Sequence, residues 1–227
     1  MPRIQKIPAY QNKVSKKHTV TAIDPHLLQI VKQFGVTPKV INEYGVGGRT
    51  HFFRAVASNF PGFKIYRYID PNKDMKASFE EAIAEKEKPI KKQLQKIKFI
   101  FKNYENTSQL SADLILSHYN AYFISSIPAV LTKIILDLNI GGIAILREML
   151  VAFEDKEFPL STINYLRKKY GANFLFLAHE ETGLKRIDKI TDDFIRRNST
   201  LTIDIVIQLK NIITYKKRIK LLKQLGR

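Results

Sequence analysis

A chain of 227 residues, 44% of them hydrophobic and 26% charged, has the size and composition of one folded domain with a full core. The absence of cysteine excludes disulfides, cysteine nucleophiles and thiolate zinc sites, and we expect no bound metal. The first residues lack the apolar run of a secretion signal, so we expect an intracellular, cytoplasmic protein. Residues 114–132 carry no charged side chain, but polar residues interrupt them, and we predict no membrane span.

The formal net charge of +17 is concentrated in three stretches of the chain. Residues 1–18 hold five Lys or Arg and no acid, residues 86–102 hold seven Lys and one acid, and residues 210–227 hold seven Lys or Arg and no acid. Such stretches attract RNA, DNA or an anionic membrane surface, or simply keep a protein in solution. We therefore predict a basic arm (residues 1–20), a folded domain (residues 21–209) and a basic amphipathic helix (residues 210–227), with RNA as a candidate partner.

Helices and strands alternate along almost the whole predicted domain. The first half contains a helix at residues 25–34, strands at residues 39–43 and 63–69, a helix at residues 50–59, and a long helix from residues 70–72 to about residue 87. The second half contains strands at residues 97–101, 113–117, 143–147, 174–178 and 201–209, and helices at residues 128–138 and 162–170. We expect Ser126 to cap the helix that follows it, and Gly141 with Gly142 to form a turn.

This order predicts an α/β fold whose doubly wound, mostly parallel sheet has seven strands, with helices on both faces. No clear crossover helix separates the two final strands, so the last strand is predicted to be antiparallel to its neighbour. Ligands of such sheets bind beyond the carboxyl ends of the strands, where the strand order switches. The functional site is therefore expected near Gly45.

The segment VINEYGVGG, residues 40–48, is the strongest local indication of function. An apolar strand leads into Glu43 and then into three glycines, which let backbone amides approach a ligand closely. Asp70 ends the second predicted strand, 27 residues after Glu43, where a carboxylate can accept hydrogen bonds from both hydroxyls of a ribose. An ordinary tight turn and a helix N-cap would also explain these residues. Together they favour an adenosine-containing ligand.

The segment EYGVGG resembles the first motif of the class I S-adenosylmethionine-dependent methyltransferases, in which an acid precedes alternating glycines. The matching positions are Glu43, Gly45 and Gly47. Arg49 stands where that family commonly has its third glycine. The resemblance continues through residues 112–148, which look like the family's fourth strand, next helix and fifth strand, and it covers about residues 39–209. The segments NFPGFKIYRYIDPNKDM, YFISSIPAVLTKI and RNSTLTIDIVI are also similar to the histamine N-methyltransferases.

This resemblance implies S-adenosylmethionine as the cofactor and a set of residues around it. The implied cofactor-binding residues are Glu43, Gly45 and Gly47 at the methionine and sugar, Asp70 at the ribose, and Asn103 or Tyr104 at the adenine. Ser117 and His118, at the end of the predicted fourth strand, would face the methyl group.

S-adenosylmethionine is an activated methyl donor, so the protein must chiefly align a nucleophile with the methyl group and exclude water. If the acceptor is a hydroxyl or a protonated amine, a base must remove its proton, and His118 is the best-placed side chain for this. A packing role explains His118 equally well. Tyr119, Asn120 and Tyr122 are candidates for the acceptor pocket, because aromatic walls with a few polar groups suit a nucleobase or a small aromatic amine.

Three functions remain open from the sequence alone. An RNA methyltransferase explains the basic stretches, and we place it first. A small-molecule N- or O-methyltransferase explains the similarity to the histamine enzymes, and a non-catalytic methyltransferase-like subunit explains Arg49 in place of a motif glycine. A nicotinamide-binding Rossmann protein is disfavoured, because GVGGRT lacks the G-x-G-x-x-G spacing.

Overall fold

The computed structural model describes residues 25–45, 50–84, 92–118, 126–153, 159–180 and 183–209. Eight strands in these ranges form one sheet. They are β1 (Val40–Tyr44), β2 (Ile65–Ile69), β3 (Ile97–Ile100), β4 (Ala112–His118), β5 (Leu138–Met149), β6 (Ala172–Glu180), β7 (Gly183–Ile187) and β8 (Thr202–Leu209). The helices are α1 (Pro25–Gln33), α2 (His51–Asn59), α3 (Met75–Ala84), α5 (Ile127–Asp137), α6 (Leu160–Tyr170) and α7 (Asp192–Arg197), with short 3-10 helices η1 (Leu94–Lys96), η2 (Tyr104–Asn106) and η3 (Leu150–Phe153).

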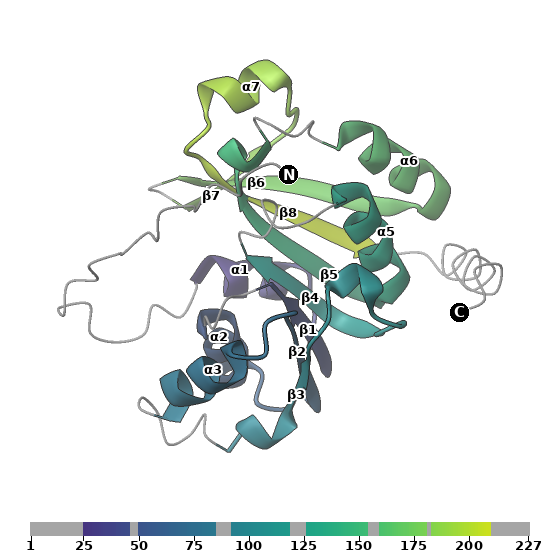
Figure 1. Ribbon diagram of the computed structural model, residues 1–227. Helices are drawn as coiled ribbons and strands as arrows, with labels where there is room; N and C mark the ends of the chain where they lie inside the picture. Colours follow the sequence, from purple (N-terminus) through teal and green to yellow (C-terminus); the bar gives the residue numbers. More distant parts are fainter. Residues whose placement is uncertain are drawn as a thin grey trace, which may run out of the picture.

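The strand order is β3-β2-β1-β4-β5-β8-β6-β7, so β1 lies between β2 and β4 (Figure 1). Strands β1 to β5 are parallel, β8 is antiparallel to both β5 and β6, and β7 is antiparallel to β6. The chain thus builds the sheet outward from β1 in one direction and then from β4 in the other, and the switch lies between these two strands. The predicted α/β fold, mostly parallel sheet and antiparallel last strand are confirmed.

The seven predicted strands are all present, but the described residues contain an eighth, β7, which the sequence did not reveal. Its sequence, GLKRI, has a partly or fully exposed side chain at every position. It lies at one edge of the sheet and pairs only with β6 among the strands of the sheet. A short, charged edge strand lacks the apolar alternation by which strands are recognised, because little of it is buried.

Helices cover both faces of the sheet, as predicted, because alternate side chains of each strand point to opposite faces. One face carries α1, α2 and α3, which pack on it through residues such as Leu27, Phe53 and Phe79. The other carries α5 and α6, which pack through residues such as Ile134 and Leu166. We call these the α1–α3 face and the α5–α6 face. None of the helices in the described ranges is long and apolar enough to cross a membrane.

The predicted start of α5 is confirmed, because a serine directly before a helix commonly acts as its N-cap. Ser126 caps α5 as predicted, since its Oγ accepts a hydrogen bond from the Ala129 amide at 3.3 Å.

The long helix α3 starts later than predicted, at Met75. Asp70 and Asn72 each accept the amide hydrogen two residues ahead, at 2.8 and 3.0 Å, which folds residues 70–74 into turns. The predicted end of that helix, the arm and the terminal helix lie outside the described residues.

The prediction of a turn at Gly141 and Gly142 is wrong, because both residues lie inside β5. The pairing of β4 with β5 shifts register there, from Ala112 opposite Leu138 to Leu114 opposite Ile143. Gly141 has a φ of +79°, and a Cβ on Gly142 would come within 2.8 Å of the carbonyl oxygen of Asp113. The glycines therefore form a bulge that lets β5 pass close to β4.

Candidate functional site

The parallel strands β1, β2 and β4 end side by side, and the predicted site residues follow this edge. Tyr44, the last residue of β1, pairs with Ile69 of β2 and Ser117 of β4. The next residue, Gly45, donates its amide hydrogen to the Ile69 carbonyl at 3.0 Å. Asp70 directly follows β2. The fold thus brings residues from distant parts of the sequence to one edge of the sheet.

Glu43 is fully buried at the end of β1, at 0% exposure. Its Oε2 accepts a hydrogen bond from the Tyr66 hydroxyl of β2, whereas its Oε1 has no hydrogen-bond partner among the described residues. Burial raises the pKa of the Glu43 carboxyl to about 8, although the hydrogen bond from Tyr66 acts to lower it. The carboxyl group is therefore mainly protonated at neutral pH when no ligand is bound.

Gly45 adopts a φ of +69°, a left-handed conformation that favours glycine over any residue with a Cβ. This conformation turns the chain out of β1 toward α2, whose first turn lies at the same edge. The following residues of the motif, among them Gly47 and Arg49, lie outside the described residues, so their predicted roles stay predictions.

Asp70 is 7% exposed and its Oδ1 accepts the Asn72 amide hydrogen at 2.8 Å. It does not cap a helix, since α3 begins only at Met75. The backbone amide of Asp70 donates a hydrogen bond to the Ile100 carbonyl at 3.1 Å, so this turn contacts the end of β3. The carboxylate is thus fixed at the sheet edge beside Gly45, where a ribose is expected.

The two residues predicted near the adenine lie in different environments. Asn103 is exposed and directly precedes η2. Tyr104 is buried: its ring stacks on Tyr44 with centroids 4.4 Å apart, and its hydroxyl donates to Asp137 Oδ2 at 2.9 Å. These contacts hold Tyr104 in the core of the α5–α6 face. Solvent therefore reaches Asn103 and not Tyr104.

Ser117 and His118 end β4 and point to opposite faces. Ser117 is buried and hydrogen-bonds the Tyr44 hydroxyl on the α5–α6 face. His118 is half-buried on the α1–α3 face, where its ring meets the ring of His51 edge-on, with centroids 4.4 Å apart, and that of Phe52 at 5.3 Å. Tyr119, Asn120 and Tyr122 lie outside the described residues.

A polar row that the sequence analysis missed continues from His118 across the same face. Arg147 of β5 pairs with Asp204 of β8, and His179 of β6 approaches the same carboxylate, with Nε2 2.9 Å from Oδ2. The ring of His26, at the start of α1, lies 4.8 Å from that of His179. All four described histidines therefore lie along this edge.

Asp204 is the centre of this row. Burial alone would raise its pKa, but hydrogen bonds from His179 and Arg147 outweigh burial and hold the pKa below its usual range. The one signal in the sequence was the acid within LTIDIVIQL, which interrupts an otherwise regular apolar strand. Among the described residues no group of three or more His, Cys, Asp or Glu side chains could hold a metal ion.

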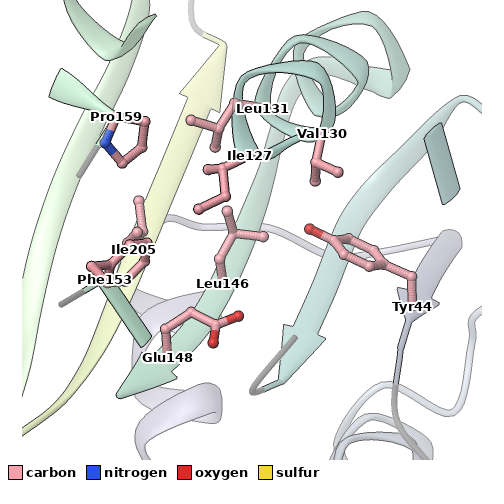
Figure 2. A pocket seen from close by; sticks show the side chains of 9 residues that line it. All are labelled: Tyr44, Ile127, Val130, Leu131, Leu146, Glu148, Phe153, Pro159 and Ile205. Carbon is pink, nitrogen blue, oxygen red and sulfur yellow. The ribbon is translucent and has the colours of Figure 1, made fainter. Parts of the chain in front are cut away.

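A hollow lies on the opposite, α5–α6 face of this edge (Figure 2). About 360 Å³ lies within it when open solvent at its mouth is counted, whereas the space in which the centre of a water molecule fits is about 20 Å³. Its walls are mainly apolar side chains of α5, β5, β8 and η3, and Tyr44 and Glu148 also line it. Figure 2 shows the Tyr44 hydroxyl directed into it from the end of β1. It can hold a small group with a mainly apolar surface.

No family model matches the chain, and no curated protein is significantly similar to it in sequence. Solved structures of methyltransferases are similar in fold. The N-methyltransferase NodS from Bradyrhizobium japonicum WM9, in complex with S-adenosylhomocysteine, is 9% identical over 88% of this chain and 94% of its own, with a TM-score of 0.55. The plantazolicin methyltransferase BpumL, also in complex with S-adenosylhomocysteine, is 12% identical over 83% and 84%, with a TM-score of 0.57.

A candidate RNA methyltransferase from Pyrococcus horikoshii is 12% identical over 82% of this chain and 81% of its own, with a TM-score of 0.50. Identities this low show the fold and not the reaction. The chain has the fold of the class I S-adenosylmethionine-dependent methyltransferases.

Proposed function

We propose that this chain is an S-adenosylmethionine-dependent methyltransferase. The observation that carries the proposal is the placement of Glu43, Gly45 and Asp70 at the strand-order switch of a sheet with the methyltransferase fold. The residues fit the cofactor. Glu43 offers a buried oxygen without a hydrogen-bond partner among the described residues, and Asp70 offers a fixed carboxylate to a ribose.

When bound, the cofactor supplies a methyl group already activated by its positive sulfur. An acceptor would have to present a lone pair in line with that methyl group, and a hydroxyl or an ammonium group presents a reactive lone pair only when its proton leaves. The imidazole of His118, on β4 next to β1, would accept that proton. The chain's own part is to align the two reactants and to hold this proton.

Replacing Asp70 by alanine is expected to weaken S-adenosylhomocysteine binding by roughly 1–3 kcal/mol, because the ribose loses a charged hydrogen-bond partner. Isothermal titration calorimetry of the full chain measures this. Asp74→Ala is the matched control, since Asp74 is an exposed carboxylate in the same turn. Equal affinity of the two variants would remove Asp70 from the site. No measurable binding by the unmodified chain would overturn the proposal and favour a non-catalytic subunit.

The acceptor that we propose is RNA. The described part of the second basic stretch, residues 92–102, includes β3, the edge strand nearest Asp70. Lys98 on β3, Lys92 before η1 and Lys102 after β3 are exposed. Phe101 follows β3 with 37% of its surface exposed and stacks on Phe99. Exposed cations beside an aromatic ring suit a phosphate backbone and an unpaired base.

The double variant Lys98→Gln/Lys102→Gln is expected to weaken binding of single-stranded RNA and to flatten its salt dependence, by about 0.7 in slope for each phosphate that the protein no longer neutralises. Filter binding across a range of salt concentrations measures both. Lys185→Gln/Lys189→Gln, with exposed lysines in and just after β7 at the other end of the sheet, is the control. If both double variants bind RNA alike, β3 is not the RNA-binding edge.

The hollow on the α5–α6 face favours a second candidate acceptor, a small molecule. Its apolar walls, with the hydroxyl of Tyr44 and the carboxyl of Glu148, suit a small ligand with few polar groups. Methyl-transfer assays on total RNA and on a metabolite pool distinguish the two acceptors. Methylation of the metabolite pool alone would reject RNA.

A further inference from the structure

A buried ion pair stands beside His118. Arg147 is 6% exposed and Asp204 is 0% exposed. The pair is bidentate: Arg147 Nε donates to Asp204 Oδ1 at 2.8 Å, and Nη2 donates to Oδ2 at 2.9 Å. This planar arrangement fixes the guanidinium group on the α1–α3 face.

Two contacts connect this pair to His118. Arg147 is the direct neighbour of His118 in the pairing of β5 with β4. The guanidinium carbon also lies 5.5 Å from the centre of the Phe52 ring, and the same ring meets His118 at 5.3 Å. The ion pair is therefore next to His118 both along the sheet and through α2.

Titratable and charged groups on this face come from several elements. His51 of α2 and Arg147 of β5 are next to His118, Glu43 with its partner Tyr66 lies on β1 and β2, and Asp204, His179 and His26 lie farther along the row. Two of the histidines are on strands. His118 is on β4, which is next to β1, whereas His179 is on β6, three strands away from β4, or about 14 Å at the usual strand spacing. Of these two histidines on strands, His118 is the one near β1, and His51 of α2 lies beside it with ring centroids 4.4 Å apart.

A base must become an imidazolium when it takes up a proton. An uncompensated arginine beside His118 would oppose that charge, and an uncompensated aspartate would favour it even when no acceptor is bound. We propose that Arg147 and Asp204 are a positioning pair for His118: the ion pair holds its surroundings fixed and presents no net charge to it. This role of the pair rests on the proposed function only because it requires His118 to act as the base in methyl transfer.

The test is the titration of the His118 ring by NMR in the full chain, with its Cε1 proton assigned by His118→Gln. Asp204→Asn removes the negative charge that pairs with Arg147, so the titration midpoint is expected to fall by about one pH unit. Arg147→Met removes the cation next to His118 and leaves Asp204 with His179 as its partner, so the midpoint is expected to rise by about the same amount. The double variant Asp204→Asn/Arg147→Met is expected to return close to the unmodified chain.

Two controls separate charge from shape. Arg147→Lys keeps the charge and should leave the midpoint nearly unchanged, and Asp193→Asn makes the same change of charge in the exposed pair with Arg197. If Asp204→Asn does not fold, Arg147→Met and the double variant still show the direction in which the His118 titration midpoint moves. Shifts in the same direction in both single variants, or no shift in Arg147→Met, would overturn the proposal. The titration needs neither cofactor nor acceptor. It can therefore show the expected shifts even if S-adenosylhomocysteine does not bind, and it can fail to show them even if S-adenosylhomocysteine binds.

Discussion

Asp204→Ala is expected to lower the free energy of unfolding by about 3–5 kcal/mol, one of the largest single-residue losses that we expect in this chain. The variant leaves the guanidinium of Arg147 buried without the carboxylate that accepts two of its hydrogen bonds, and it removes the partner of His179. Urea unfolding at pH 7 measures the loss. Asp193→Ala breaks an exposed pair and should cost far less.

The pH dependence of this loss follows from the lowered pKa of Asp204, which burial opposes and the hydrogen bonds from His179 and Arg147 produce. An aspartate with a lowered pKa stabilises the folded state above its unfolded pKa, and this stability is lost as pH falls through the folded pKa. The difference between the unmodified chain and Asp204→Ala should therefore shrink in strong acid. A difference that grows with acidity would contradict the assignment.

Glu43→Gln is expected to have the opposite pH dependence. The folded carboxyl keeps its proton up to a pKa of about 8, whereas the unfolded one loses it near 4.5, so the folded state binds more protons between these values. The unmodified chain must then lose stability as pH rises through this window, by about 3–5 kcal/mol in total. Glutamine carries no proton to lose, and the variant should escape that loss.

Unfolding of both proteins at pH 5 and at pH 8.5, without cofactor, measures this effect. The stability of Glu43→Gln relative to the unmodified chain should increase from the lower to the higher pH. Tyr66→Phe is a useful companion, because it removes the hydroxyl that donates to Glu43. A constant difference between Glu43→Gln and the unmodified chain would mean that Glu43 is ionised in the folded state.

The sequence predicted those features that depend on neighbours along the chain. Alternation of apolar residues located seven strands, and the cap at Ser126 needed only the residue and the helix after it. Errors arose where one residue type has two uses. Paired glycines serve in turns and in bulges, and the register shift at Gly142 depends on the approach of Asp113 from another strand.

The candidate site divides in the same way. Glu43, Gly45 and Asp70 belong to one βαβ unit, so a single stretch of sequence was enough to associate them. The row of Arg147, Asp204 and His179 is assembled from three strands, and Asp204 is 57 and 25 residues from its partners. Its assembly depends on the insertion of β8 between β5 and β6, and residue types in the sequence do not specify that order.

The proton held by Glu43 bears on how the proposed donor would bind. An empty site with a neutral carboxyl avoids burying an unpaired anion. Under the proposed function, the ammonium group of a methionine moiety would arrive near this carboxyl and displace its proton. Donor binding would then be an exchange of one cation for another, and the site would gain a ligand without gaining charge.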